Sequence, residues 1–168
     1  VDVVCLAVEE AKKLLKITGK TVITGNPVRE SIIYKSKAEA RKELGLDDKV
    51  CILSFGGSLG ALTINRIAAD LMEWHQDTNA VNHIHGYGQL GVEAFPKMLK
   101  ERGVNLQSHP RIDARQYIDN MDACLAAADL VICRSGAITL SELEVAGKAS
   151  ILIPCPTVSE NHQYHNAM

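Results

Sequence analysis

The stretch KVCILSFGGSLGALTINRIAADLMEWH (Lys49–His75) contains the pattern that decides the fold. Its first part, Lys49–Phe55, is a continuous apolar run with the length of a buried strand. The glycine-rich turn Gly56–Ala61 follows, and a helix is predicted from about Leu62 to His75. A strand that enters a helix through a glycine turn is typical of folds in which helices cover a parallel sheet.

The same alternation extends along the chain in both directions. Further strands are predicted at Val1–Val8, Lys20–Gly25, Ala80–Gly86, Asp129–Gly136 and Ala149–Pro156. Further helices are predicted at Glu9–Lys16, Ser36–Leu44, Glu93–Arg102, Ile118–Ala128 and Ile138–Gly147, and Pro96 fits only in the first turn of its helix. Right-handed crossovers then give an α/β fold, a Rossmann-like, doubly wound and mostly parallel sheet. In such folds ligands bind at the carboxyl ends of the strands.

The composition excludes several classes of function. The 168 residues carry 18 basic and 20 acidic side chains, and this balance argues against nucleic acid as the partner. The longest apolar stretch, Ala123–Cys133, is too short to cross a bilayer and contains Asp129. The chain starts without Met, inside a strand-like run, and shows no signal peptide. We therefore expect a piece of a longer protein.

Cysteine and histidine spacing gives no sign of a disulfide framework or a metal centre. The five cysteines contain no Cys-x-x-Cys pair and are predicted to be buried, reduced thiols of a cytosolic protein: Cys5, Cys51, Cys124, Cys133 and Cys155. His83 and His85 would share one face of a strand, and His162 and His165 form the other close pair. Neither pair matches a metal-binding motif.

Two strand-to-helix turns have the chemistry to bind phosphate. In Gly56–Ala61, paired glycines let a ligand approach the backbone, the helix start offers unpaired N–H groups, and Ser58 adds a hydroxyl. The alternative is that Ser58 only caps the helix. The turn Arg134–Glu142 repeats the pattern, and two such helix starts suit a diphosphate. Glu142 could accept hydrogen bonds from both ribose hydroxyls, or it could simply stabilise the first turn of its helix.

Two other polar segments are weaker candidates. Gly25–Arg29 forms a rigid Asn-Pro turn that leaves Arg29 free to meet an anion or only solvent. The cluster Glu160–Asn166 suits the hydroxyls of a sugar, or equally a solvated helix start. The sequence lacks G-x-G-x-x-G, a P-loop lysine and an Asp-x-Asp metal motif. A nucleotide diphosphate would therefore be held by backbone dipoles and arginine.

Four motifs resemble, in this order, the C-terminal half of the MurG family, bacterial N-acetylglucosaminyltransferases of peptidoglycan synthesis: TGNPVRESI, LSFGGSLGALTIN, YIDNMDACLAAADLVICRSGAITLSELEVAGK and ILIPCPTVSENHQYHNA. The resemblance implies the two-domain GT-B fold. Residues 17–168 would form the UDP-GlcNAc-binding domain, and residues 1–16 the tail of an N-terminal acceptor domain. It also implies inverting transfer of GlcNAc from UDP-GlcNAc to undecaprenyl-pyrophosphoryl-MurNAc-pentapeptide, which turns lipid I into lipid II.

The resemblance also implies a role for individual residues. Arg29 would contact the donor nucleotide, Ser58 a phosphate, and the backbone of Ile118 the uracil edge. The diphosphate and ribose would be wrapped by Ala137, Ile138, Thr139, Leu140, Ser141 and Glu142, with Glu142 on the ribose hydroxyls. Gln163, with Asn166 as an additional candidate, would hold the GlcNAc hydroxyls. Leu59 stands where the family often has Gln, so a side-chain contact from that position is not expected.

The family's glycine-rich acceptor motif and its general base have no counterpart in this sequence. We therefore expect no catalytic residue in this chain, no metal and no cofactor, and donor binding without transfer. The resemblance places the full-length enzyme in the cytoplasm, peripheral on the cytoplasmic face of the cell membrane. Three other functions remain open: another GT-B enzyme with a UDP-sugar (a lipid glucosyltransferase or UDP-GlcNAc epimerase), a non-catalytic donor-binding subunit, and a nicotinamide-dependent dehydrogenase domain, which the glycine pattern disfavours.

Overall fold

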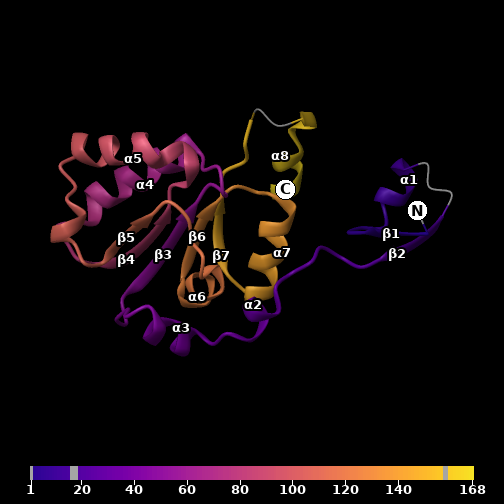
Figure 1. Cartoon of the computed structure of the whole chain (residues 1–168), viewed down its shortest axis with the longest axis horizontal. Helices are drawn as coiled ribbons and strands as arrows, with labels where there is room; N and C mark the ends of the chain where they lie inside the picture. Colours follow the sequence, from indigo (N-terminus) through magenta and orange to yellow (C-terminus); the bar gives the residue numbers. More distant parts are fainter. Residues whose placement is uncertain (1, 16–18, 157–158) are drawn as a thin grey trace.

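The computed structural model describes residues 2–15, 19–156 and 159–168 and contains two sheets (Figure 1). The strands are β1 Val3–Leu6, β2 Lys20–Ile23, β3 Val50–Phe55, β4 Val81–Gly86, β5 Ile112–Arg115, β6 Leu130–Cys133 and β7 Ala149–Leu152. The α-helices are α1 Ala11–Leu14, α2 Glu30–Tyr34, α3 Lys37–Glu43, α4 Leu62–His75, α5 Gly88–Glu101, α6 Met121–Ala127, α7 Ala137–Ala146 and α8 His162–Ala167. Short 3-10 helices lie at Leu106–Ser108 and Ser159–Asn161.

The main sheet is parallel, with the strand order β5-β4-β3-β6-β7. From the central β3 the chain first moves outward through β4 and β5, then returns to add β6 and β7 on the other side. The order therefore reverses between β3 and β6, which is the switch point of a doubly wound fold. The predicted Rossmann-like fold is confirmed.

Helices cover both faces of this sheet, which explains the continuous apolar runs of its central strands (Figure 1). One core cluster joins β3 and β6 to α6, with Leu53, Leu125 and Val131 almost fully buried. A second cluster joins α4 and α5, through Met72 and Phe95, to the opposite face. The strand ends between these two layers are the place where the fold positions a ligand site.

Several predictions about elements need correction. No strand is predicted at Ile112–Arg115 and no helix at Glu30–Tyr34, yet β5 and α2 lie there. Helix α5 begins at Gly88, so Pro96 lies in the helix interior and not in the first turn. An interior proline removes the bond to the carbonyl four residues earlier and crowds that carbonyl, and burial of Phe95 and Leu99 in the core offsets this cost. The helix predicted at Glu9–Lys16 is shorter and spans Ala11–Leu14. Val1 and Lys16 lie outside the described residues.

The prediction of buried thiols holds for three of the five cysteines. Cys51, Cys124 and Cys133 are buried, and burial raises the pKa of Cys51 to about 11 and that of Cys133 to about 12. The prediction is wrong for Cys5, which is exposed, and Cys155 is only half-buried. Cys5 lies on β1, which belongs to a two-stranded sheet with little around it.

Strands β1 and β2 do not join the main sheet. β1 pairs in parallel with β2, and this small sheet lies apart from the five-stranded sheet in Figure 1. The segment Thr24–Arg29 connects the two parts. The predicted domain boundary at residues 16 and 17 stays a prediction. Within the described residues, none of the helices combines the length and the apolar character that crossing a membrane requires.

Candidate functional site

A cavity of about 160 Å³ opens at the carboxyl edge of the main sheet. β3 and β4 end at it with Phe55 and Gly86, and the segment after β5 adds residues 116–118. α7, which follows β6, closes the other side with Glu142. The cavity therefore lies at the switch point between β3 and β6, where doubly wound folds bind their ligands.

Four of the predicted binding residues come together around this cavity. Arg29, Ser58, Ile118 and Glu142 line it from four separate segments of the chain. A guanidinium nitrogen of Arg29 lies 3.5 Å from Oε1 of Glu142. The Glu142 side chain is 14% exposed and that of Arg29 is 53% exposed. The carboxylate is thus held at the cavity wall, while the arginine can move away at little cost because water screens the pair.

Glu142 belongs to the second turn of α7. The helix begins at Ala137, with Gly136 at the N-cap and no side-chain cap, and its first intrahelical bond runs from the N–H of Leu140 to the carbonyl of Gly136 at 3.0 Å. Glu142 is therefore the sixth helical residue, and the alternative role of stabilising the first turn is wrong. In the described part of the chain the N–H groups of residues 137–139 have no hydrogen-bond acceptor. They remain available to an anion.

The glycine turn after β3 also leaves its helix start uncapped. Ala61 is the N-cap of α4, with no side-chain cap, so the alternative role of Ser58 as an N-cap is wrong. The carbonyls of Ser58 and Leu59 accept hydrogen bonds from the N–H groups of Gln89 and Leu90 at the start of α5. These two N–H groups of α5 therefore stabilise the glycine turn. The Ser58 hydroxyl, which has no partner among the described residues, stays available at the cavity.

Ile118 contributes a buried side chain and a backbone at the cavity. The side chain is 5% exposed, and a Cβ placed on Gly86 would lie 3.1 Å from its Cδ1. Packing thus fixes Ile118, which leaves its backbone as the group able to meet a ligand. Sequence reasoning missed Gln116 and Tyr117, which also line the cavity. The signal that could have identified them is their place directly after β5, a strand that was not predicted.

Comparison with known proteins identifies the family. The profile described as glycosyltransferase family 28 C-terminal domain matches residues 51–168. The chain belongs to this family. The matched range contains every residue that lines the cavity except Arg29.

Relatives named UDP-N-acetylglucosamine--N-acetylmuramyl-(pentapeptide) pyrophosphoryl-undecaprenol N-acetylglucosamine transferase resemble nearly the whole chain. The one from Acetivibrio thermocellus is 42% identical over 99% of this chain and 44% of its own length. The one from Desulforamulus reducens is 39% identical over 99% of this chain and 45% of its own. The crystal structure of Acinetobacter baumannii MurG matches with a TM-score of 0.62 and 30% identity, over 98% of this chain and 43% of that one. This family 28 chain thus spans less than half the length of these relatives, and its fold is that of one half of a GT-B enzyme.

Gln163 and Asn166 lie on α8, outside the cavity lining of the family 28 domain. Oε1 of Gln163 accepts a hydrogen bond from the N–H of Cys155 at 2.9 Å. The Ser135 hydroxyl donates to the Gln163 carbonyl at 2.6 Å, and the Asn166 amide donates to the Ser135 carbonyl at 3.1 Å. α8 is therefore docked on the turn that precedes α7. The predicted contact of Gln163 with a sugar stays a prediction.

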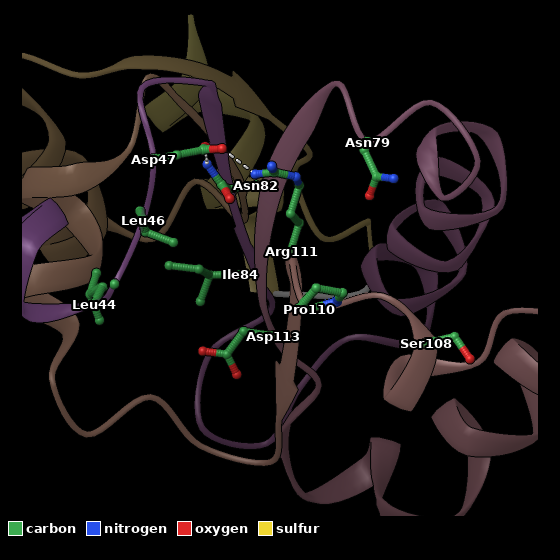
Figure 2. A pocket seen from close by; sticks show the side chains of 11 residues that line it. Leu44, Leu46, Asp47, Asn79, Asn82, Ile84, Ser108, Pro110, Arg111 and Asp113 are labelled. Atoms are coloured by element: carbon green, nitrogen blue, oxygen red, sulfur yellow. Dashed lines mark hydrogen bonds and ion pairs between the residues drawn. The ribbon is translucent and has the colours of Figure 1, made fainter.

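A larger cavity, of about 710 Å³, lies at the opposite, amino edge of the sheet (Figure 2). Three of its polar side chains satisfy one another: Asp47 pairs with Arg111 and accepts a hydrogen bond from the Asn82 amide at 2.9 Å. The bond from Asn82 and the charge of Arg111 lower the pKa of Asp47 to about 2. Asp113 pairs with Arg115. The charged groups of this cavity are therefore paired with one another or with Arg115, whereas the carboxyl-edge cavity lies at the switch point and brings four predicted binding residues together. The candidate site of this family 28 domain is therefore the carboxyl-edge cavity.

The predicted common face of His83 and His85 is confirmed. Both rings lie 2.8 Å from the Ser54 hydroxyl, and His83 also meets Nε2 of His75 at 3.0 Å, which makes a buried hydrogen-bonded chain. Within residues 2–15, 19–156 and 159–168, no group of three or more His, Cys, Asp or Glu side chains could hold a metal ion.

Proposed function

We propose that this chain is the UDP-GlcNAc-binding half of an inverting glycosyltransferase that transfers GlcNAc to undecaprenyl-pyrophosphoryl-MurNAc-pentapeptide in peptidoglycan biosynthesis. One observation carries the proposal: Arg29, Ser58 and Glu142 converge on a cavity at the switch point, beside two uncapped helix starts. The printed names of relatives that are 39% and 42% identical support the choice of donor and acceptor.

The nucleoside end of the donor would occupy the cavity. Its volume of about 160 Å³ is below the roughly 300–1,000 Å³ of sites that enclose whole small molecules, so only part of a nucleotide sugar would enter. The uracil edge would meet the backbone of Ile118, and the ribose hydroxyls would donate to the Glu142 carboxylate. Ribose binding would then replace the partly exposed contact between Glu142 and Arg29.

The diphosphate would lie against the starts of α4 and α7, where Ser58 and the N–H groups of residues 137–139 face it. In the transfer, an acceptor hydroxyl attacks the anomeric carbon from the face opposite UDP, the bond from that carbon to the diphosphate oxygen breaks, and the configuration inverts. The hydroxyl proton passes to a base, and UDP leaves with the bonding electrons. Uncapped helix starts stabilise the negative charge that develops on UDP.

The base and the acceptor site would come from the remainder of the enzyme, because this chain spans less than half the length of its relatives. We assign no catalytic residue here and expect no transfer by this chain alone. The lipid-linked acceptor would reach the intact enzyme at the cytoplasmic face of the membrane.

Calorimetric titration with UDP, UDP-GlcNAc, UDP-glucose and GDP, each with and without a chelator, tests the proposal. We expect UDP and UDP-GlcNAc to bind independently of metal, and GDP not to bind because its larger base does not fit beside Ile118. Stronger binding of UDP-GlcNAc than of UDP-glucose would favour the GlcNAc transferase over a lipid glucosyltransferase. Absence of UDP binding, or equal binding of GDP, would contradict the proposal.

A further inference from the structure

The segment that connects the two sheets is fastened to the start of α7. Nδ2 of Asn26 lies 3.0 Å from the Ser141 hydroxyl oxygen and 3.4 Å from the carbonyl oxygen of Ala137. An amide N–H only donates, so both oxygens act as acceptors. One half-buried side chain thus ties together parts of the chain that are 115 and 111 positions apart.

The same segment carries Arg29 to Glu142. Between Asn26 and Arg29, Val28 packs against the core cluster of β3, β6 and α6. The segment therefore contacts the domain at three successive points, of which the first and the last are on α7.

The local backbone directs the Asn26 side chain toward α7. Gly25 has a φ of +71°, a conformation that favours glycine and turns the chain out of β2. Asn26 precedes Pro27, whose ring restricts the preceding residue to extended backbone. Replacement of Asn26 by another residue therefore keeps the path of the segment and removes only the contact with α7.

We propose that Asn26 is a positioning residue of the donor site: it latches the connecting segment to α7 and so holds Arg29 and Glu142 at the cavity. The inference rests on the proposed function for the role of Glu142 toward ribose. Asn26 itself does not line the cavity, so it acts through the two residues that do. Without the latch, the segment and the α7 start can separate, and Glu142 loses its fixed place at the cavity wall.

The ligand-free chain gives the first test, by hydrogen–deuterium exchange. Asn26→Ala and Ser141→Ala remove the same bond from its two sides, so each should speed exchange in residues 24–34 and 137–142 by roughly tenfold, the scale of one lost hydrogen bond. Thr24→Ala is the matched control, because among the residues that the structure describes the Thr24 hydroxyl bonds only to the neighbouring Gly25 carbonyl. Unchanged exchange in both variants overturns the latch.

UDP affinity gives the second test. Asn26→Ala should weaken UDP binding by about 3- to 10-fold in the wild-type background and have no further effect in the double variant Arg29→Ala/Glu142→Ala, because it acts through these two residues. An unchanged affinity, or an equal loss in both backgrounds, overturns the positioning role. If the unaltered chain fails to bind UDP while exchange still responds to Asn26→Ala, the proposed function falls and the latch stands.

Discussion

At the scale of single residues, we expect the proposed donor binding to depend most on the Glu142 side chain. Its carboxylate is held at the cavity wall, and a charged hydrogen bond to a ligand contributes about 1–3 kcal/mol. Glu142→Ala should therefore weaken UDP binding by about 5- to 150-fold, measured by calorimetry. The free energy of unfolding of the Glu142→Ala variant should differ from that of the unaltered chain by less than about 1 kcal/mol. The lost ion pair with Arg29 contributes little, because the Arg29 side chain is exposed to solvent.

Glu144→Ala is the matched control for this prediction. Glu144 lies on the same helix, is exposed, and does not line the cavity, so its removal should leave UDP affinity unchanged. Equal losses of affinity in the two variants would mean that general charge near α7, and not a contact from Glu142, attracts the nucleotide.

Sequence reasoning predicted some residues of the candidate site and missed others for physical reasons. Ser58 and Glu142 stand next to glycine turns after apolar strands, a local pattern that one segment displays by itself. Gln116 and Tyr117 follow the strand IDAR. Its four residues show only a weak alternation of apolar and polar side chains, and two of them are charged. The pairing of β5 with β4 creates that strand, and single-segment periodicity does not show pairing.

At the scale of helices and strands, tertiary contacts determine the existence or the bounds of those that were missed or misplaced from the sequence. The central strands β3 and β4 were predicted because both of their faces are covered, which requires apolar residues throughout. α5 starts well before the predicted Glu93. The N–H of Gly88 bonds to the Gln116 carbonyl, and those of Gln89 and Leu90 bond to carbonyls of the glycine turn after β3. These long-range contacts favour a helix start that glycine disfavours locally.

The buried histidine chain behind β3 and β4 makes the stability of the fold sensitive to acid. The Ser54 carbonyl lies 3.1 Å from Nδ1 of His85 and only accepts, so Nδ1 carries the proton, and Nε2 is buried without a partner in the described part of the chain. Burial lowers the pKa of His85 from 6.5 to about 4, and burial also lowers the pKa values of His83 and His75. Below pH 6.5 the unfolded chain therefore binds protons that the folded chain excludes.

The free energy of unfolding should consequently fall as pH decreases from 7 toward 4. His85 alone should account for about 2 kcal/mol of the loss between pH 7 and pH 5, at 1.36 kcal/mol per pKa unit. Urea unfolding at a series of pH values measures this change. His85→Gln should flatten the dependence by that amount whatever its effect at pH 7, whereas His165→Gln, at an exposed position on α8, should not. An unaltered slope in His85→Gln would exclude His85 as a source of the pH dependence.

At the scale of the whole molecule, the chain consists of one well-packed sheet and one small sheet with very different burial. Leu53 and Val131 in the main sheet are fully buried, whereas Val3 and Ile23 in the small sheet are 46% and 50% exposed. Leu6 is the buried apolar residue that β1 and β2 contribute. An isolated pair of strands is marginally stable in water, so β1 and β2 should open without unfolding of the main sheet.

Hydrogen exchange measures this difference directly. Amides of residues 3–6 and 20–23 should exchange at least about 100-fold faster than those of β3, because local opening costs far less free energy than global unfolding. Leu6→Ala should speed exchange in the small sheet and leave β3 unaffected, and Leu53→Ala should lower protection throughout the main sheet. Equal protection of the two sheets would show that the connecting segment makes them one cooperative unit. In that case the contacts of Asn26 and Arg29 with α7 would couple opening of the small sheet to unfolding of the main sheet, in addition to their role at the proposed donor site.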